Sequence, residues 1–173
     1  MAGHGFYGFE TNNFIGSTAQ QNTFKGGRWA EFWVTCRIEP LLRKLRDGER
    51  RVTKTDRLLV AIGENLAEHN PPAAPLHGDL WSGNVGFDSD GVPVLFDPAF
   101  YRGDPETDLA FSRLFGGFGK EFYTAYEREV PTTRGAAKRR AIYNLYHALN
   151  HLLLFGEVYR PLVNEEVRKI LDR

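Results

Sequence analysis

The stretch LHGDLWSGNVGFDSDGVPVLFDPA, Leu76 to Ala99, decides the fold because it combines polar residues at fixed spacings with a predicted hairpin. Asp79 stands two residues after His77, Asn84 follows five residues later, and Asp97 comes thirteen residues after that. Two short β-type runs lie between Asn84 and Asp97 and flank DSDG, which is a hairpin turn signal. The sequence therefore predicts two carboxylates and a carboxamide held around one small hairpin.

These residue types suit phosphoryl transfer. A carboxylate on a rigid loop can accept a proton from a hydroxyl group, and Asn and Asp oxygens are the ligands that Mg²⁺ prefers. Phosphoryl transfer needs little beyond such positioning and charge neutralisation. The protein-kinase catalytic loop has the same order, His-x-Asp-x-x-x-x-Asn, a hairpin and then a metal-binding Asp. Any one of His77, Asp79, Asn84 and Asp97 alone is an ordinary loop residue, whereas the four together favour a kinase-type site.

The chain also resembles one family within the aminoglycoside phosphotransferase and choline kinase group, in which His-Gly-Asp replaces the His-Arg-Asp of protein kinases. It looks like the fructosamine kinase (ketosamine kinase) family over nearly all of its length. The motifs that carry the resemblance are LHGDLWSGNV, FDPAFYRGDPETDLAF, LFGGF, YNLYHALNHLLLFG and NFIGSTAQQN, together with the helix from Trp29 to Pro40. The resemblance implies an α+β, mostly helical fold, the C-terminal lobe of a protein-kinase-like (aminoglycoside phosphotransferase-like) fold, with residues 1–173 as a single domain.

The resemblance also implies roles for particular residues. Asp79 is the catalytic base that receives the proton of the attacking sugar hydroxyl, and Asn84 and Asp97 hold Mg²⁺ against the phosphates of ATP. His77 supports the loop through hydrogen bonds. Asp108, in the DLA motif, fixes the loop through its backbone, which is also what an Asp near a helix N-terminus does for structure alone.

Trp81 and Asp104 lie within or close to the same stretch. Trp81 lies between the base and the first metal ligand, and it is either a platform for the sugar or a packed side chain. The family usually has His or a similar residue where Asp104 stands, so we expect no catalytic role for Asp104. The implied substrate is a ketosamine, as a small molecule or as a glycated lysine of a protein.

Composition excludes several other classes. The 22 basic and 22 acidic residues balance, which gives no electrostatic case for nucleic acid or for an anionic membrane as a partner. The single cysteine, Cys36, excludes an internal disulfide framework and suits a reducing compartment. The sequence MAGHGFYGFETNNF lacks the features of a signal peptide, so we expect a cytoplasmic protein.

The rest of the chain reads as helices around the central stretch. Apolar spacing predicts helices over residues 28–46, 53–69, 105–115, 119–129 and 135–155, and a last short helix capped by Asn164. Residues 1–27 read as loop with one short strand. Pro40 is expected to kink or split the first helix. Trp29, Phe32 and Trp33 form a stripe at helical spacing, which we expect in the core.

Three other patterns in the sequence resemble known kinds of site, and for each of them we favour a structural explanation. Gly3 to Gly8 spells G-x-G-x-x-G, but no strand precedes it, so we expect a loop and no phosphate site. His147 and His151 share a helix face, as zinc ligands do, but a third ligand is missing, and we favour packing with Tyr143, Tyr146 and Asn150. The basic run Lys138 to Arg140 is expected to be a solvated face.

A two-lobed kinase also needs a Gly-rich cover for the phosphates and a strand lysine. None of Lys25, Lys44 and Lys54 sits on a plausible central strand. We therefore expect that the N-terminal nucleotide-binding lobe is absent, that the chain binds MgATP weakly and turns over little, and that its exposed lobe face drives self-association. Two alternatives stay open: a related kinase acting on an aminoglycoside, choline or homoserine, and a non-catalytic lone lobe that serves as a binding module.

Overall fold

The computed structural model describes residues 6–172. Its helices are α1 (Trp29–Trp33), α2 (Glu39–Asp47), α3 (Thr55–Leu66), α4 (Glu106–Ser112), α5 (Lys120–Glu129), α6 (Ala136–Phe155) and α7 (Arg160–Leu171). Short helical turns occur at Val34–Ile38, Ser82–Asn84 and Glu157–Tyr159. The strands are β1 (Asn13–Ile15), β2 (Thr18–Gln20), β3 (Ala74–Leu76), β4 (Val85–Phe87), β5 (Pro93–Leu95) and β6 (Tyr101–Gly103).

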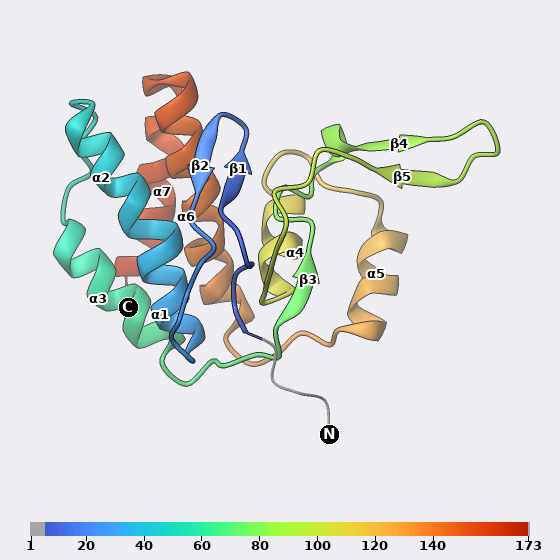
Figure 1. Ribbon diagram of the computed structural model, residues 1–173, viewed down its shortest axis with the longest axis horizontal. Helices are drawn as coiled ribbons and strands as arrows, with labels where there is room; N and C mark the ends of the chain where they lie inside the picture. Colours follow the sequence, from blue (N-terminus) through green and yellow to red (C-terminus); the bar gives the residue numbers. More distant parts are fainter. Residues whose placement is uncertain (1–5, 173) are drawn as a thin grey trace.

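Helices form most of the body, and α6 lies at its centre, in contact with α2, α3, α4 and α7 (Figure 1). The strands form three antiparallel pairs, β1 with β2, β3 with β6, and β4 with β5. The pair β3–β6 joins the central stretch to α4, whereas β4–β5 projects away from the body (Figure 1). The prediction of an α+β fold is confirmed, with about half of the residues in helices and the strands in small sheets. Among the described residues, no helix is long and apolar enough to cross a membrane.

The segment from α1 to α2 is one continuous helical run, so Pro40 does not split it. The preceding turn, Val34–Ile38, is instead a π-helix, with a wider backbone spacing. Proline lacks an N–H group and clashes with the carbonyl of the residue four positions earlier. The wide turn accommodates both defects, and the run ends at Asp47 with Gly48 as its cap.

The core is aromatic at the junction of α1 and α6. Trp29, Phe32 and Trp33 are fully buried, which confirms the predicted stripe. The indole of Trp29 donates a hydrogen bond to the Tyr143 hydroxyl at 2.9 Å, and the rings of Trp33 and Tyr143 lie 4.9 Å apart, edge to face. Such pairs add to the stabilisation that burial gives.

The predicted last helix was wrong at its start. Asn164 lies inside α7, which begins at Arg160 with Pro161 in its first turn. Proline is favoured there because its missing N–H would be unpaired in any case. Glu165 and Glu166 therefore lie in mid-helix, where both contact Lys169 at 2.8 Å.

The expectation of a solvated basic run was wrong for Arg139. Its side chain is buried and forms an ion pair with Glu106 of α4. Its neighbours Lys138 and Arg140 are exposed, as predicted. A run of three charges on a helix spans most of one turn, so its members cannot all face solvent.

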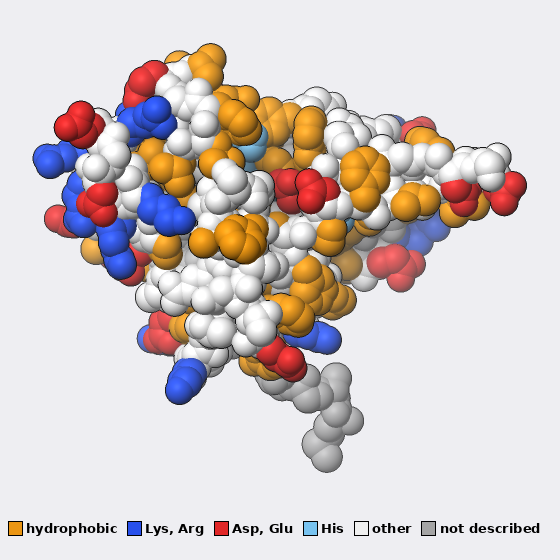
Figure 2. Space-filling view, turned by 45° about the horizontal axis from the view of Figure 1, so that its top comes forward, with side chains coloured by type: hydrophobic (Ala, Val, Ile, Leu, Met, Phe, Trp, Pro, Cys, Tyr) orange, Lys and Arg blue, Asp and Glu red, His pale blue; other side chains and the backbone are white. Residues whose placement is uncertain are grey.

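The hairpin β4–β5 confirms the predicted turn. The Asp88 carboxylate accepts hydrogen bonds from the backbone N–H groups of Asp90 and Val92, and Gly91 takes a positive φ of 78°. Figure 2 shows this hairpin extending from the body with hydrophobic side chains along it. Five of its side chains are largely exposed: Phe87, Val92, Val94, Leu95 and Phe96.

The N-terminal region carries the two strands of a hairpin, β1–β2, where one short strand was predicted. Of the G-x-G-x-x-G pattern, Gly3 and Gly5 lie outside the described residues. Gly8 exchanges two 2.8 Å backbone hydrogen bonds with Arg102 and lies against Asn22, whose carbonyl oxygen would be 2.0 Å from an added Cβ. Gly8 is thus packed against the body in a way that leaves no space for a side chain.

Candidate functional site

The loop after β3 is held by Asp108. The two carboxylate oxygens of this buried residue accept hydrogen bonds from the backbone N–H groups of His77, at 2.8 Å, and Gly78, at 2.9 Å. Asp108 lies in the first turn of α4, where a negative charge is also favourable. One side chain therefore connects α4 to the start of the loop that carries Asp79.

Gly78 makes this loop possible. Its φ is +80°, and a Cβ atom there would lie 2.1 Å from the carbonyl oxygen of Ala99. Only glycine combines that backbone conformation with such a close approach. The loop thus passes directly over the segment that follows Asp97.

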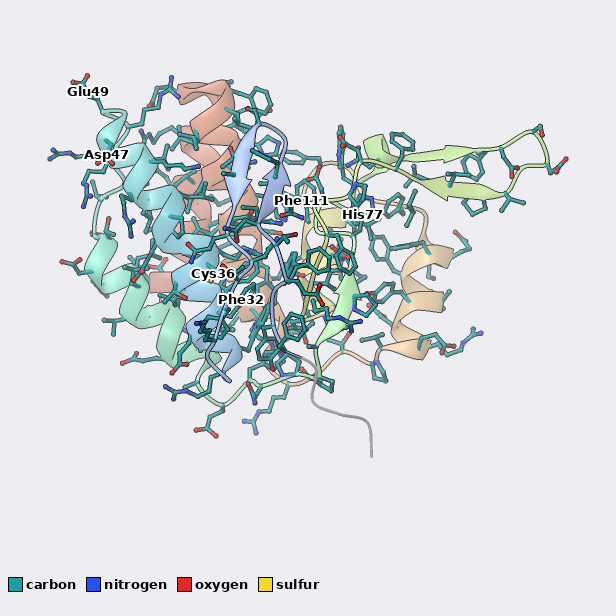
Figure 3. All side chains as sticks on the ribbon, in the orientation of Figure 1. Phe32, Cys36, Asp47, Glu49, His77 and Phe111 are labelled. Atoms are coloured by element: carbon teal, nitrogen blue, oxygen red, sulfur yellow. The ribbon has the colours of Figure 1, made fainter. Side chains whose placement is uncertain are left out.

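His77 joins the same two segments through its ring. Its Nδ1 accepts a 3.3 Å hydrogen bond from the backbone N–H of Asp79, which leaves the Nε2 proton to be donated to the carbonyl oxygen of Phe96 at 3.0 Å. Figure 3 shows His77 at the base of the projecting hairpin. The ring ties the loop to the end of β5.

Asn84 holds one oxygen of the Asp79 carboxylate. Its amide group is buried and donates hydrogen bonds to the backbone carbonyl oxygen of Asp79, at 2.9 Å, and to Asp79 Oδ2, at 3.1 Å. The amide nitrogen is therefore occupied, and the Asn84 Oδ1 atom remains as an oxygen ligand. The turn Ser82–Asn84 sets this geometry, since its first bond runs from the Asn84 N–H to the Trp81 carbonyl oxygen.

The Asp79 carboxyl group has a raised pKa of about 6. Burial is the main cause, and the charges of Asp97 and Asp108 add to it, while the hydrogen bond from Asn84 and the proximity of His77 act in the opposite direction. A carboxylate in this range is well matched to taking up a proton near neutral pH.

Asp97 follows β5 with a φ of 55°, in the left-handed region that non-glycine residues rarely adopt. Backbone strain of this kind is common at functional sites. The side chain is exposed, and its charge raises the pKa of Asp79, so the two carboxylates share one region. With Asn84 Oδ1, the Asp97 carboxylate gives a hard, all-oxygen donor set that fits a magnesium ion.

Trp81 lies beside the loop and is half-buried. Its ring covers Gly83, where an added Cβ would approach the ring atoms to 2.3 Å. One part of the ring is therefore packed, and the other part is open to solvent. The geometry is compatible with both roles considered for Trp81.

A second polar cluster lies apart from this loop and consists of His69, Asp104 and Glu106, whose side-chain donor atoms lie within 4.8 Å of one another. Asp104 Oδ2 accepts 2.6 Å hydrogen bonds from His69 Nε2 and the Tyr143 hydroxyl. Glu106 is paired with Arg139. These bonds already satisfy the acidic oxygens, so the cluster is a structural network that joins three segments.

His147 was not among the predicted site residues, although the structure brings it next to Asp79. Its Nδ1 atom lies 4.0 Å from Asp79 Oδ1, and its ring stacks on Phe111 of α4 at 3.6 Å between centroids. The predicted packing holds for Tyr146, whose ring is 5.1 Å away. No spacing along α6 indicates the approach to Asp79, because it is formed between distant parts of the chain.

Comparison with known proteins agrees with the loop geometry. The family model for fructosamine kinase matches residues 1–173. The chain is 42% identical over 166 residues to a Vibrio parahaemolyticus protein named "Probable ketoamine kinase VP1481", covering 96% of this chain and 57% of the relative. It is 43% identical over 158 residues to the chloroplastic protein-ribulosamine 3-kinase of Arabidopsis thaliana, covering 89% of this chain and 48% of the relative.

Solved structures also resemble this chain. The crystal structure described as "Putative fructosamine-3-kinase" from Haemophilus somnus superposes with a TM-score of 0.88 at 31% identity, covering 95% of this chain and 56% of that one. A second, from Thermobifida fusca, gives 0.86 at 32% identity, covering 96% and 59%. The chain thus spans about half the length of the relatives it matches. With a match over its whole length and this identity, the chain belongs to the fructosamine kinase family.

Proposed function

We propose that this chain carries the catalytic base, the metal ligands and the substrate side of a ketosamine kinase, as the C-terminal lobe of a protein-kinase-like fold. The reaction is ATP-dependent phosphorylation of a sugar hydroxyl on a fructosamine or ribulosamine. The observation that carries the proposal is the arrangement of Asp79 and Asn84, in which the Asn84 amide group holds the carboxylate and leaves its own oxygen free.

In this proposal Asp79 accepts the proton of the attacking hydroxyl, and its raised pKa suits that step. Asn84 Oδ1 and the Asp97 carboxylate hold Mg²⁺, which, when bound with ATP, neutralises the phosphate charge. His77 and Asp108 keep the loop in place through the hydrogen bonds described above. The exposed part of the Trp81 ring provides an apolar surface for one face of the sugar.

We further propose that the isolated chain binds MgATP weakly and turns over little, because the site is built on one side only by these residues. The coverage of the relatives, about half of their length, supports this. Because these residues build the site from one side only, the β4–β5 hairpin keeps an exposed apolar surface. We propose that this surface drives self-association of the isolated chain.

Binding to the purified chain tests the substrate side without requiring turnover. We expect fructosyl-lysine or ribulosyl-lysine to shift the NMR signals of the Trp81 indole and the loop around Asp79, whereas lysine mixed with free fructose leaves them unchanged. In the same sample, Mn²⁺ in place of Mg²⁺ is expected to broaden the signals of Asn84 and Asp97. Asp90, an exposed carboxylate at the hairpin turn, is the control for nonspecific binding of the ion.

Other outcomes lead to the alternatives. Stronger shifts with kanamycin, choline or homoserine would assign the chain to a related small-molecule kinase. Binding of none of these compounds, with no broadening by Mn²⁺, would favour a non-catalytic binding module. Phosphorylation of a ketosamine by the isolated chain that is lost in Asp79→Asn would contradict the proposed inactivity while supporting the assigned base.

A further inference from the structure

His147 is a buried polar residue of α6 whose position next to Asp79 has no structural explanation so far. Its side chain is 4% exposed, and its ring lies flat on the Phe111 ring with an interplanar angle of 11°. Its Nδ1 atom is out of contact with solvent and has no hydrogen-bond partner among the described residues. An unpaired buried polar atom costs about 1–3 kcal/mol, so such atoms are rarely left without a use.

One acceptor near this atom is the carboxylate of Asp79. The Nδ1–Oδ1 distance of 4.0 Å is longer than a hydrogen bond, so a bond between them requires the Asp79 side chain to turn toward His147. A bridging water does not fit well. It would have to make two hydrogen bonds of about 2.8 Å at an angle of about 90° to span that distance.

The neutral imidazole is the favoured form of His147 in the folded chain. Burial is the main reason that the pKa of His147 lies well below its usual value, and the proximity of His151 and Arg37 acts in the same direction. The low pKa argues against two roles for His147: the cationic half of an ion pair with Asp79, and the group to which Asp79 passes a proton. A neutral imidazole still has one N–H to donate.

The other oxygen of the carboxylate is already held, since Asp79 Oδ2 accepts from the Asn84 amide group. A donor at Oδ1 would hold the carboxylate at both oxygens, which fixes its rotation as well as its place. Precise orientation of a base relative to the hydroxyl group that it deprotonates is a large part of catalysis in this chemistry.

We propose that His147 is a positioning residue: its neutral imidazole carries the proton on Nδ1 and donates it to Asp79 Oδ1, orienting the carboxylate toward the substrate hydroxyl. The hydroxyl proton goes to Asp79, and His147 keeps its own proton throughout. The inference rests on the proposed role of Asp79 as the base. Phe111 contributes by stacking on the ring, which holds the plane of the imidazole.

The tautomer of His147 is the first test, and it requires neither nucleotide nor turnover. In the chain labelled with ¹⁵N-histidine, the imidazole nitrogen shifts distinguish the two neutral tautomers. We expect His147 as the Nδ1–H form, and we expect Asp79→Ala to shift it to the Nε2–H form, which neutral histidine prefers in water. Asp90→Ala removes an exposed carboxylate and is expected to leave the tautomer unchanged.

The orientation of Asp79 is the second test. Three-bond couplings report whether its χ1 angle stays in one rotamer. We expect a single rotamer in the native chain and in His147→Asn, because the Asn amide nitrogen takes a place close to that of Nδ1. We expect rotamer averaging in His147→Phe, which keeps the stack on Phe111 but has no donor.

Two results would overturn the proposal: His147 as the Nε2–H tautomer in the native chain, or an Asp79 rotamer that stays fixed in a folded His147→Phe variant. If His147→Phe does not fold, the tautomer and its response to Asp79→Ala decide the question alone. Neither measurement depends on ketosamine binding. A chain that binds no ketosamine but shows the Nδ1–H tautomer would contradict the proposed function and leave this hydrogen bond intact.

Discussion

Arg139 of α6 and Glu106 of α4 form a bidentate ion pair, with Nε–Oε2 and Nη2–Oε1 distances of 2.7 Å each. Their side chains are 6% and 13% exposed, so the pair joins two helices in a largely dry environment. Because α4 also carries Asp108, this ion pair helps to set the position on α6 of the loop that carries Asp79.

We therefore expect Arg139→Ala to lower the free energy of unfolding by about 3 kcal/mol, because it leaves the Glu106 carboxylate buried without its partner. Arg139→Lys should recover little, since an ammonium group cannot make the two parallel bonds. Arg140→Ala, at an exposed neighbouring position, is the control and should change stability by less than about 0.5 kcal/mol. Urea unfolding measures all three variants, and equal effects at positions 139 and 140 would contradict the assignment.

Gly78 and Gly91 offer a matched pair for the loop. Both have a φ close to +80°, but an added Cβ at Gly78 would meet the Ala99 carbonyl oxygen at 2.1 Å, whereas nothing lies within 4 Å at Gly91. We expect Gly91→Ala to cost about 1 kcal/mol from backbone strain alone. Gly78→Ala should cost at least about 2 kcal/mol more, because the loop has to move. Thermal or urea unfolding compares the two, and a similar loss in both would show that the close approach is not needed.

Asp79 should make the folded chain less stable above pH 6. Its pKa is about 6 when folded and near 3.8 when unfolded, so the folded chain binds more protons between these values. The stabilisation by protonation is thus complete below pH 4 and is lost as the pH rises through 6. We expect Asp79→Asn to be more stable than the native chain by about 2 kcal/mol at pH 7.5, after allowance for its partial exposure, and no more stable at pH 4. Unfolding curves at the two pH values measure the difference, and a gain of the same size at both would refute the raised pKa.

The β4–β5 hairpin should make the isolated chain self-associate. Phe87 is 72% and Leu95 55% exposed, on a two-stranded sheet whose outer edges pair with no other strand within residues 6–172. Exposed apolar strands with free edges tend to pair with other chains. We expect sedimentation velocity to show association that increases with concentration and is lost in the double variant Phe87→Ser, Leu95→Ser. Val60→Ser, which removes an exposed apolar side chain of α3, is the control. Association that survives the double variant would place the contact elsewhere.

Features that depend only on residues close together in the sequence could be predicted from it. The β4–β5 turn was predictable because the Asp88 carboxylate and the positive φ of Gly91 act within five residues. The start of α7 was missed because Asn164 and Pro161 are both valid signals for a helix start. The chain uses the earlier one, which gives α7 the length with which it packs along α6.

Pairings between distant residues were not predictable in this way. The charge pattern around Arg139 contains no sign of Glu106, which lies 33 residues earlier. The i, i+4 spacing correctly put His147 and His151 on one helix face, but only the packing of α4 on α6 shows that Asp79 lies next to His147. The roles of Asp79, Asn84 and Asp97 came from their spacing and from resemblance. The bonds that hold them became visible only in three dimensions.

The π-helical turn at Val34–Ile38 also decides which side chains of α2 enter the core. Each residue of an α-helix advances the side-chain direction by about 100°, so an uninterrupted helix starting at Trp29 would turn Pro40 and Lys44 inward. The wide turn absorbs one residue, and Leu41 and Leu45 are buried in their place while Lys44 stays in solvent. A regular α-helix of the same length would therefore turn Pro40 and Lys44 inward, whereas deleting one residue from this turn would remove the extra residue and keep Leu41 and Leu45 in the core. The wide turn thus corrects the rotational phase between the two halves of one helix.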